Sequence, residues 1–145
     1  MFAPKKAWQS YRQVATQTAS PGQVVLLLYS GILRFLEQAR LGFGLDDPKE
    51  FNEAINNNIQ RAQAIINELN YSLNMDVGGE HAANLRRLYN YFDQRLDESN
   101  LKKTPEGIEE VTARMRVLRD AWAAMLNQQG PTMSGEAGAT LQATG

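Results

Sequence analysis

The sequence predicts an all-α protein, an antiparallel up-down four-helix bundle with an N-terminal arm and a disordered C-terminal tail. Apolar residues recur at helical spacing, and no stretch alternates convincingly with the period of two that is typical of a β-strand. Three of the four expected helices begin with the same arrangement, a capping side chain directly before a proline. The connections are short, and short connections make successive helices antiparallel, which favours an up-down bundle.

The first helix is expected at residues 21–44, where Ser20 precedes Pro21 and forms a capping box with Gln23. Its apolar residues cover roughly 200° of a helical wheel, about twice the usual stripe of at least ~100°. Such an arc exceeds what a small bundle buries. The excess is expected to meet the N-terminal arm, a partner protein or a second copy of the chain, unless long flanking side chains hide it. The arc contains Val24, Val25, Leu26, Leu28, Tyr29, Ile32, Leu33, Phe35, Leu36 and Ala39.

The second helix is expected at residues 48–75. Asp47 precedes Pro48, and Glu50 is placed to complete a second capping box. The apolar residues of this helix form one narrow stripe, as those of the fourth helix do. A single stripe is typical of a helix with one face in a core.

The third helix is expected at residues 80–100, because a glycine pair breaks the chain before it and Glu80 suits the positive end of the helix dipole. The fourth is expected at residues 105–128, with Thr104 as its cap. These boundaries divide the chain into an arm at residues 1–19, a bundle domain at 20–128 and a tail at 129–145. The tail is rich in glycine, alanine, threonine and serine, a composition that favours disorder.

Several classes of function find no support in the composition. The chain lacks cysteine, so it has neither a disulfide framework nor a thiolate metal site. Its single histidine, His81, is too little for a catalytic triad or a metal site, and no phosphate-binding loop is present. We therefore expect no catalytic residues, no cofactor and no metal.

Charge and hydropathy also limit the partners. The chain has 15 basic and 16 acidic residues, a balance that does not favour nucleic acid binding. The longest apolar run, Val24 to Tyr29, is far shorter than the ~20 residues that span a bilayer. The N-terminus has no apolar signal stretch, so we expect a cytoplasmic protein without stable membrane insertion.

A set of short motifs follows in order along residues 10–127. They are Tyr11-Arg12-Gln13, Thr18-Ala19-Ser20-Pro21-Gly22-Gln23, Leu28-Tyr29-Ser30-Gly31, Ala62 to Asn70, Leu88-Tyr89-Asn90-Tyr91 and Leu118-Arg119-Asp120-Ala121-Trp122. Together they resemble the flagellar secretion chaperone FliS family. The resemblance implies a helical bundle that binds the disordered C-terminal segment of flagellin in apolar grooves. It implies further that the chaperone prevents premature polymerisation in the cytoplasm and aids delivery to the flagellar export gate.

The resemblance also implies that the N-terminal arm can occupy such a groove when flagellin is absent, and Tyr11 matches a tyrosine of that arm. We expect Tyr11 to act as a gate or contact. We expect Leu26, Tyr29 and Leu33 to form the part of the first helix that faces away from the core and binds the partner. Two alternatives stay open: a homodimeric structural bundle, and a regulatory binding protein for another flagellar client.

Overall fold

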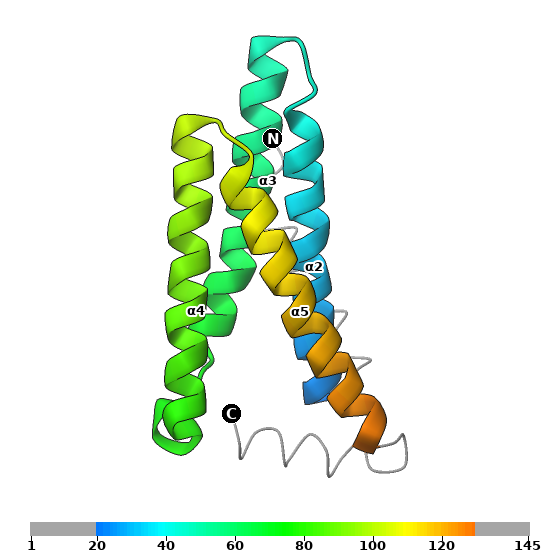
Figure 1. Ribbon diagram of the computed structural model, residues 1–145, viewed down its shortest axis with the longest axis vertical. Coiled ribbons are helices and arrows are strands. Elements are labelled where there is room, and N and C mark those ends of the chain that lie inside the picture. Colours follow the sequence, from blue (N-terminus) through cyan, green and yellow to red (C-terminus); the bar gives the residue numbers. More distant parts are fainter. Residues whose placement is uncertain (1–19, 130–145) are drawn as a thin grey trace.

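The computed structural model describes residues 20–129, which form four α-helices in one antiparallel bundle (Figure 1). Each helix packs on its neighbours in the chain, and the last helix packs on the first, so the bundle closes into a ring. The predicted all-α four-helix bundle is confirmed. Its helices are α2 (Pro21–Gly42), α3 (Pro48–Tyr71), α4 (Met75–Lys102) and α5 (Glu106–Gln129).

The two ends of the chain fall largely outside this description. The expected arm at residues 1–19 lies outside the described residues, as does the expected tail from residue 130 onward. Gln129, where the tail was expected to begin, is the last residue of α5. Among the described residues, no helix is both long enough and apolar enough to cross a membrane.

The first two helices begin where the sequence places them. Ser20 Oγ accepts a hydrogen bond from the Gln23 amide at 3.3 Å, and Gln23 Oε1 accepts one from the Ser20 amide at 3.1 Å. This is the predicted capping box, and it satisfies amides that the first turn leaves without a partner. At the start of α3, Asp47 Oδ2 accepts from the Glu50 amide at 3.0 Å.

α4 begins earlier than predicted. Asn74 caps the helix, since its Oδ1 accepts from the Val77 amide at 3.1 Å, and the helix starts at Met75 instead of Glu80. The break predicted at the glycine pair is present as a kink, because Gly79 has φ 56° and ψ −131°. Residues with a Cβ rarely adopt a positive φ of this kind, so a glycine suits the kink.

α5 begins in a way that the sequence did not indicate. Its first residue is Glu106, and the amide of Ile108 in the first turn donates to the Ser99 Oγ of α4 at 3.1 Å. Thr104, the expected cap, is exposed and makes no side-chain hydrogen bond with any described residue. The two helices also approach closely here, because a Cβ on Gly107 would lie 2.4 Å from the Arg95 carbonyl oxygen.

One core runs through the bundle and receives side chains from every helix. Burial of these apolar side chains is the main force that holds the helices together. The largest fully buried members are Tyr29, Ile32 and Leu36 of α2, Ile55, Ile59, Ile65 and Ile66 of α3, Tyr89, Phe92 and Leu96 of α4, and Ile108 and Met115 of α5.

Candidate partner-binding surface

The structure corrects the predicted orientation of two residues. Tyr29 and Leu33 were expected to face away from the core, but they are only 2% and 8% exposed and belong to the core. The physical reason is that α2 packs against both α3 and α5, so two neighbours cover its wide apolar arc. Leu26 is half-buried, and Tyr11 lies outside the described residues. The partner-binding roles of these four residues stay predictions.

Most of the partly buried apolar side chains that pack on the core lie toward one end of the bundle, and Phe35, Phe43 and Phe51 lie elsewhere. The up-down topology places the start of α2, the end of α3, the start of α4 and the end of α5 together at the lower end of Figure 1. Partly buried apolar residues pack on the core there and retain some exposure to solvent. We call this set the open-end surface: Val24 and Val25 of α2, Leu73 after α3, Leu85 and Leu88 of α4, and Leu118 and Trp122 of α5.

The opposite end of the bundle is closed. Phe43 and Phe51 pack edge-to-face across the α2–α3 connection, with ring centroids 5.5 Å apart. Both rings are half-buried, and the core residues Ile55, Ile108 and Val111 in this half of the bundle are completely buried. The core is therefore well covered where α4 ends and α5 begins, and less well covered where α4 begins and α5 ends.

Polar contacts between α4 and α5 follow the same division. In the closed half, Glu110 of α5 accepts hydrogen bonds from Tyr91 Oη and from Arg95 Nε, each at 2.7 Å. These hydrogen bonds, the Tyr91 bond first, hold the pKa of the Glu110 carboxyl below its usual range. Within the described residues, no hydrogen bond or ion pair joins residues 80–90 of α4 to residues 115–128 of α5.

Toward the open end, each of these helices is fixed to a different neighbour. Trp122 Nε1 of α5 donates to the Gly22 carbonyl oxygen of α2 at 2.7 Å. Arg86 of α4 donates to the Asn70 carbonyl oxygen of α3 at 3.1 Å, and the Asn70 amide donates to Asn90 at 2.7 Å. Figure 1 shows α4 and α5 diverging toward this end. The open-end surface is thus shared between the pair α2–α5 and the pair α3–α4.

Two buried hydroxyl groups lie next to this surface. Tyr29 Oη and Tyr89 Oη form a hydrogen bond of 2.8 Å, and burial raises the pKa of both phenols. Both therefore stay protonated at neutral pH, and one donates to the other. Trp122 packs edge-to-face on Tyr29, with ring centroids 6.4 Å apart.

The chemistry of the open-end surface is that of apolar contact. The one polar group of its side chains, the Trp122 N–H, already has an acceptor in α2. No group of three or more metal-binding side chains occurs within residues 20–129. A surface of this kind suits the apolar face of an amphipathic helix.

Several residues of the open-end surface follow from the apolar pattern of the sequence, but their partial exposure does not. The helical wheel of the fourth helix already placed Leu118 and Trp122 on an apolar stripe, which is the usual pattern of a core helix. Their partial exposure results from the divergence of α4 and α5. That divergence is a tertiary feature, and no signal in the sequence indicated it.

Comparisons of the amino-acid sequence with known proteins find a matching family and several similar chains. The family described as flagellar protein FliS matches residues 4–129, which include all four helices. The flagellar secretion chaperone FliS of Bacillus subtilis is 32% identical over 137 residues, 94% of this chain and 98% of the relative. The protein of the same name from Salmonella typhimurium is 35% identical over 118 residues, 79% of this chain and 85% of the relative. The protein of the same name from Escherichia coli is 34% identical over 131 residues, which are 87% of this chain and 93% of the relative.

Proposed function

Because the chain belongs to the FliS family of flagellar proteins, we propose that it is a flagellar secretion chaperone that binds the disordered C-terminal segment of flagellin. In this proposal it acts in the cytoplasm, keeps flagellin from polymerising too early and catalyses no reaction. It also aids delivery of flagellin to the export gate of the flagellar type III secretion apparatus.

The open-end surface is the observation that carries the proposal. A disordered segment gives up conformational entropy when it folds on a partner, so it needs apolar area to bury in return. Leu85 and Leu88 on α4 and Leu118 and Trp122 on α5 offer such area on two diverging helices. An amphipathic helix of the client, laid between them, would bury its own apolar face and complete the cover of the core.

The residues predicted from the sequence enter this proposal in different ways. Leu26 is half-buried and directly follows Val25 of the open-end surface in α2, and in this proposal it contacts the client directly. Tyr29 and Leu33 are buried, so they act indirectly by shaping the core beneath that surface. Tyr11 is the proposed gate.

Isothermal titration calorimetry of the full chain with a peptide of the flagellin C-terminal segment tests the proposal. We expect saturable one-to-one binding with a negative heat-capacity change, because apolar surface is buried as the peptide folds. The peptide should also raise the melting temperature of the chain. Neither heat nor a shift in melting temperature at high peptide concentration would overturn the proposal.

Sedimentation equilibrium of the chain alone separates the proposal from its main competitor. A homodimer would bury the same apolar surface in a symmetric interface. A mass that rises with concentration, together with a lack of peptide binding, would favour the dimer. A constant monomer mass with peptide binding would favour the chaperone.

A further inference from the structure

An arginine lies over an aromatic ring between α4 and α5, where the closed half of the bundle meets the open half. The guanidinium carbon of Arg114 on α5 is 5.5 Å from the centre of the Tyr91 ring on α4. Arg114 Nε is 3.2 Å from Glu110 Oε2, and the Tyr91 hydroxyl donates to the same oxygen at 2.7 Å. The ring and the carboxylate together hold the guanidinium in place.

The terminal nitrogens of this guanidinium are available to an anion. Neither of them makes a hydrogen bond within residues 20–129, and the side chain of Arg114 is 55% exposed. A planar guanidinium binds a carboxylate through two parallel N–H donors. Because Arg114 is already held in place, it loses less side-chain entropy when it binds such a carboxylate.

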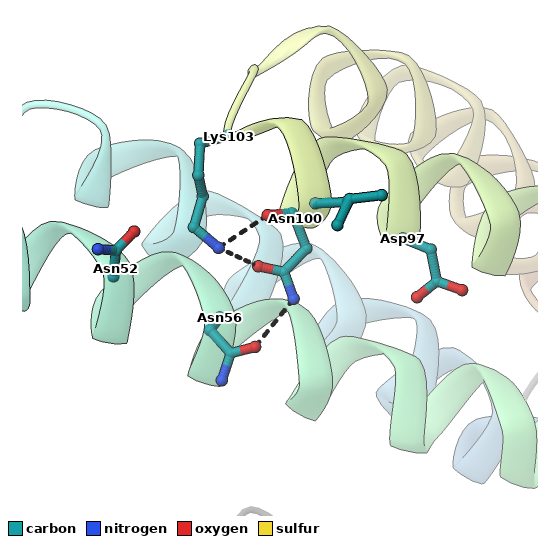
Figure 2. A pocket seen from close by; sticks show the side chains of 6 residues that line it. Asn52, Asn56, Asp97, Asn100 and Lys103 are labelled. Carbon is teal, nitrogen blue, oxygen red and sulfur yellow. Dashed lines mark hydrogen bonds between the residues drawn. The ribbon is translucent and has the colours of Figure 1, made fainter.

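The pocket between α3 and α4 at the closed end is arranged differently (Figure 2). Its lysine, Lys103, donates to the carbonyl and side-chain oxygens of Asn100, and Asn100 Nδ2 donates to Asn56 at 2.9 Å. Asp97 accepts from Gln63 at 2.7 Å. The polar side chains there bind within the protein, and the charges of Lys103 and Asp97 offset each other. The pocket therefore gives no indication of a ligand.

The acidic neighbours of Arg114 do not neutralise the basic ones. Glu110 pairs with Arg95 at 2.7 Å as well as with Arg114. Glu98 pairs with Arg95 at 3.4 Å and with Lys102 at 3.7 Å. Three basic side chains thus share two carboxylates.

Arg87 adds a fourth positive charge, since it is exposed one helical turn before Tyr91 on α4. It donates to a neighbouring asparagine and makes no ion pair with any described residue. Residues 81–92 of α4 contain no aspartate or glutamate. Residues 111–128 of α5 contain one, Asp120, which pairs with the preceding arginine at 3.1 Å. The excess charge at this position is therefore positive.

Apolar side chains begin one turn away from this charge. Val117 and Leu118 follow Arg114 by three and four residues on α5, and Leu88 directly follows Arg87 on α4. Val117 is 69% exposed, and both leucines belong to the open-end surface. A partner on that surface meets apolar side chains along most of its length and a positive charge at its inner end.

We propose that Arg114, with Arg87 as a second contact, binds an acidic side chain of the client and so sets the register of the client helix. This inference rests on the proposed chaperone function and names the chemistry of the segment that the chaperone binds. The segment is an amphipathic helix with an aspartate or glutamate at one end of its apolar face. The carboxylate lies near Tyr91, and the apolar face extends from there toward Trp122. A nucleic acid would pair with the arginines but would leave the adjoining apolar side chains uncovered.

Calorimetry of the full chain with the flagellin C-terminal peptide tests this inference. Each aspartate and glutamate of the peptide is replaced in turn by asparagine or glutamine. We expect one replacement to weaken binding about two- to fivefold, as the loss of an exposed ion pair does. The affinity of the unchanged peptide should also fall between about 50 mM and 500 mM salt, because salt screens exposed charges.

Arg114→Gln should weaken the unchanged peptide by the same factor. It should bind the replaced peptide no more weakly than the unchanged peptide, because both changes remove the same ion pair. The variant should fold normally, since Glu110 keeps its hydrogen bonds from Tyr91 and Arg95. Arg114→Lys keeps the charge without the planar donors, so it should retain the salt dependence but not the full affinity.

Arg116→Gln is the matched control, because it removes one positive charge from an exposed position on the same helix. The pKa of the Glu37 carboxyl is lowered first by Arg40 and also by Arg116, which places Arg116 on the side of α5 that faces α2. This variant should bind the peptide as the unchanged chain does.

The inference is wrong if no single replacement in the peptide changes its affinity, or if Arg114→Gln binds as Arg116→Gln does. It is also wrong if the effects of Arg114→Gln and of the peptide replacement add. In each of these cases the peptide still binds, and the chaperone function stands. If the peptide does not bind the unchanged chain at all, the chaperone function and this inference are both wrong.

Discussion

The phenolic oxygens of Tyr29 and Tyr89 lie 2.8 Å apart in the core, and their hydrogen bond joins α2 to α4 across the bundle. Both side chains are only 2% exposed. Trp122 of the open-end surface packs on Tyr29, so the tyrosine pair lies at the inner boundary of that surface. A polar pair at this depth is stable only while both hydroxyls are present, because each satisfies the other.

We predict that Tyr29→Phe and Tyr89→Phe each lower the free energy of unfolding by about 1–3 kcal/mol, since each leaves one buried hydroxyl without a partner. The double variant removes both hydroxyls and should cost less than the sum of the two single changes. Urea unfolding of the four proteins measures this coupling. Additive losses would contradict the importance of the shared bond.

The same pair predicts a dependence of stability on alkaline pH. Burial raises the pKa of Tyr29 and Tyr89 above the ordinary value of 10.0. Above about pH 10 the unfolded tyrosines lose protons that the folded ones keep, so the free energy of unfolding falls as pH rises. The stabilisation is fully present below that pH and is lost as pH climbs toward the folded pKa values.

Urea unfolding at pH 8 and pH 10.5 checks this sign. The decline should be shallower in the variant with phenylalanine at both positions, because each buried tyrosine contributes up to about 1.4 kcal/mol per pH unit. If the two proteins lose stability in parallel, other groups control the alkaline transition.

The start of α5 gives a prediction in which two neighbouring positions behave differently. Ser99→Ala should destabilise the protein by about 1 kcal/mol, because it removes the acceptor of the Ile108 amide. Thr104→Ala is the matched control and should have little effect, since its side chain is exposed and bonds to no described residue. Thermal unfolding distinguishes the two, and the reverse order would restore Thr104 as the cap.

Local signals in the sequence predicted much of the fold. The capping side chains Ser20 and Asp47 act on amides three residues away, so the starts of α2 and α3 follow from local sequence. Asn74 acts in the same local way, although the glycine pair after it is the stronger break signal and predicts a later start at Glu80. Ser99 Oγ accepts a hydrogen bond from the amide of Ile108, nine residues later and on the next helix. A cap at this distance is not predictable from the local sequence around the start of α5.

The surface was harder to predict than the fold. A helical wheel shows how wide an apolar arc is but not how many neighbours cover it. The wheel of α2 therefore leaves Tyr29 and Leu33 available to a partner, whereas in the bundle both side chains are buried because α2 packs on α3 and α5. The open-end surface depends on the divergence of α4 and α5, which is a property of helix packing and not of either sequence stripe.

The close approach of α4 and α5 predicts a large effect of one methyl group. In Gly107→Ala the new Cβ would lie 2.4 Å from the Arg95 carbonyl oxygen and from Ser99 Oγ, so the helices must separate. We expect a loss of about 1–3 kcal/mol, despite the better helix propensity of alanine. Gly44→Ala is the control, because its nearest contact would be an ordinary 3.5 Å, and its stability should change little. Equal urea midpoints for the two variants would show that the helices adjust without cost.

The proposed client site predicts that truncating a leucine of the open-end surface weakens binding of the flagellin peptide, whereas truncating a leucine outside it does not. Leu88→Ala removes part of the open-end surface and should weaken the flagellin peptide roughly tenfold, as the loss of an apolar anchor commonly does. Leu41→Ala is the matched control, because Leu41 is 52% exposed near the far end of α2, away from that surface.

Calorimetry well below both melting temperatures compares the peptide affinities of the two variants while both are fully folded. Since Leu88 is also partly packed on the core, its variant should lose some stability, but the loss of binding should persist where the protein is fully folded. If both variants bind the peptide as tightly as the unchanged chain, the client does not use the space between α4 and α5, and another face of the bundle must supply its apolar contacts.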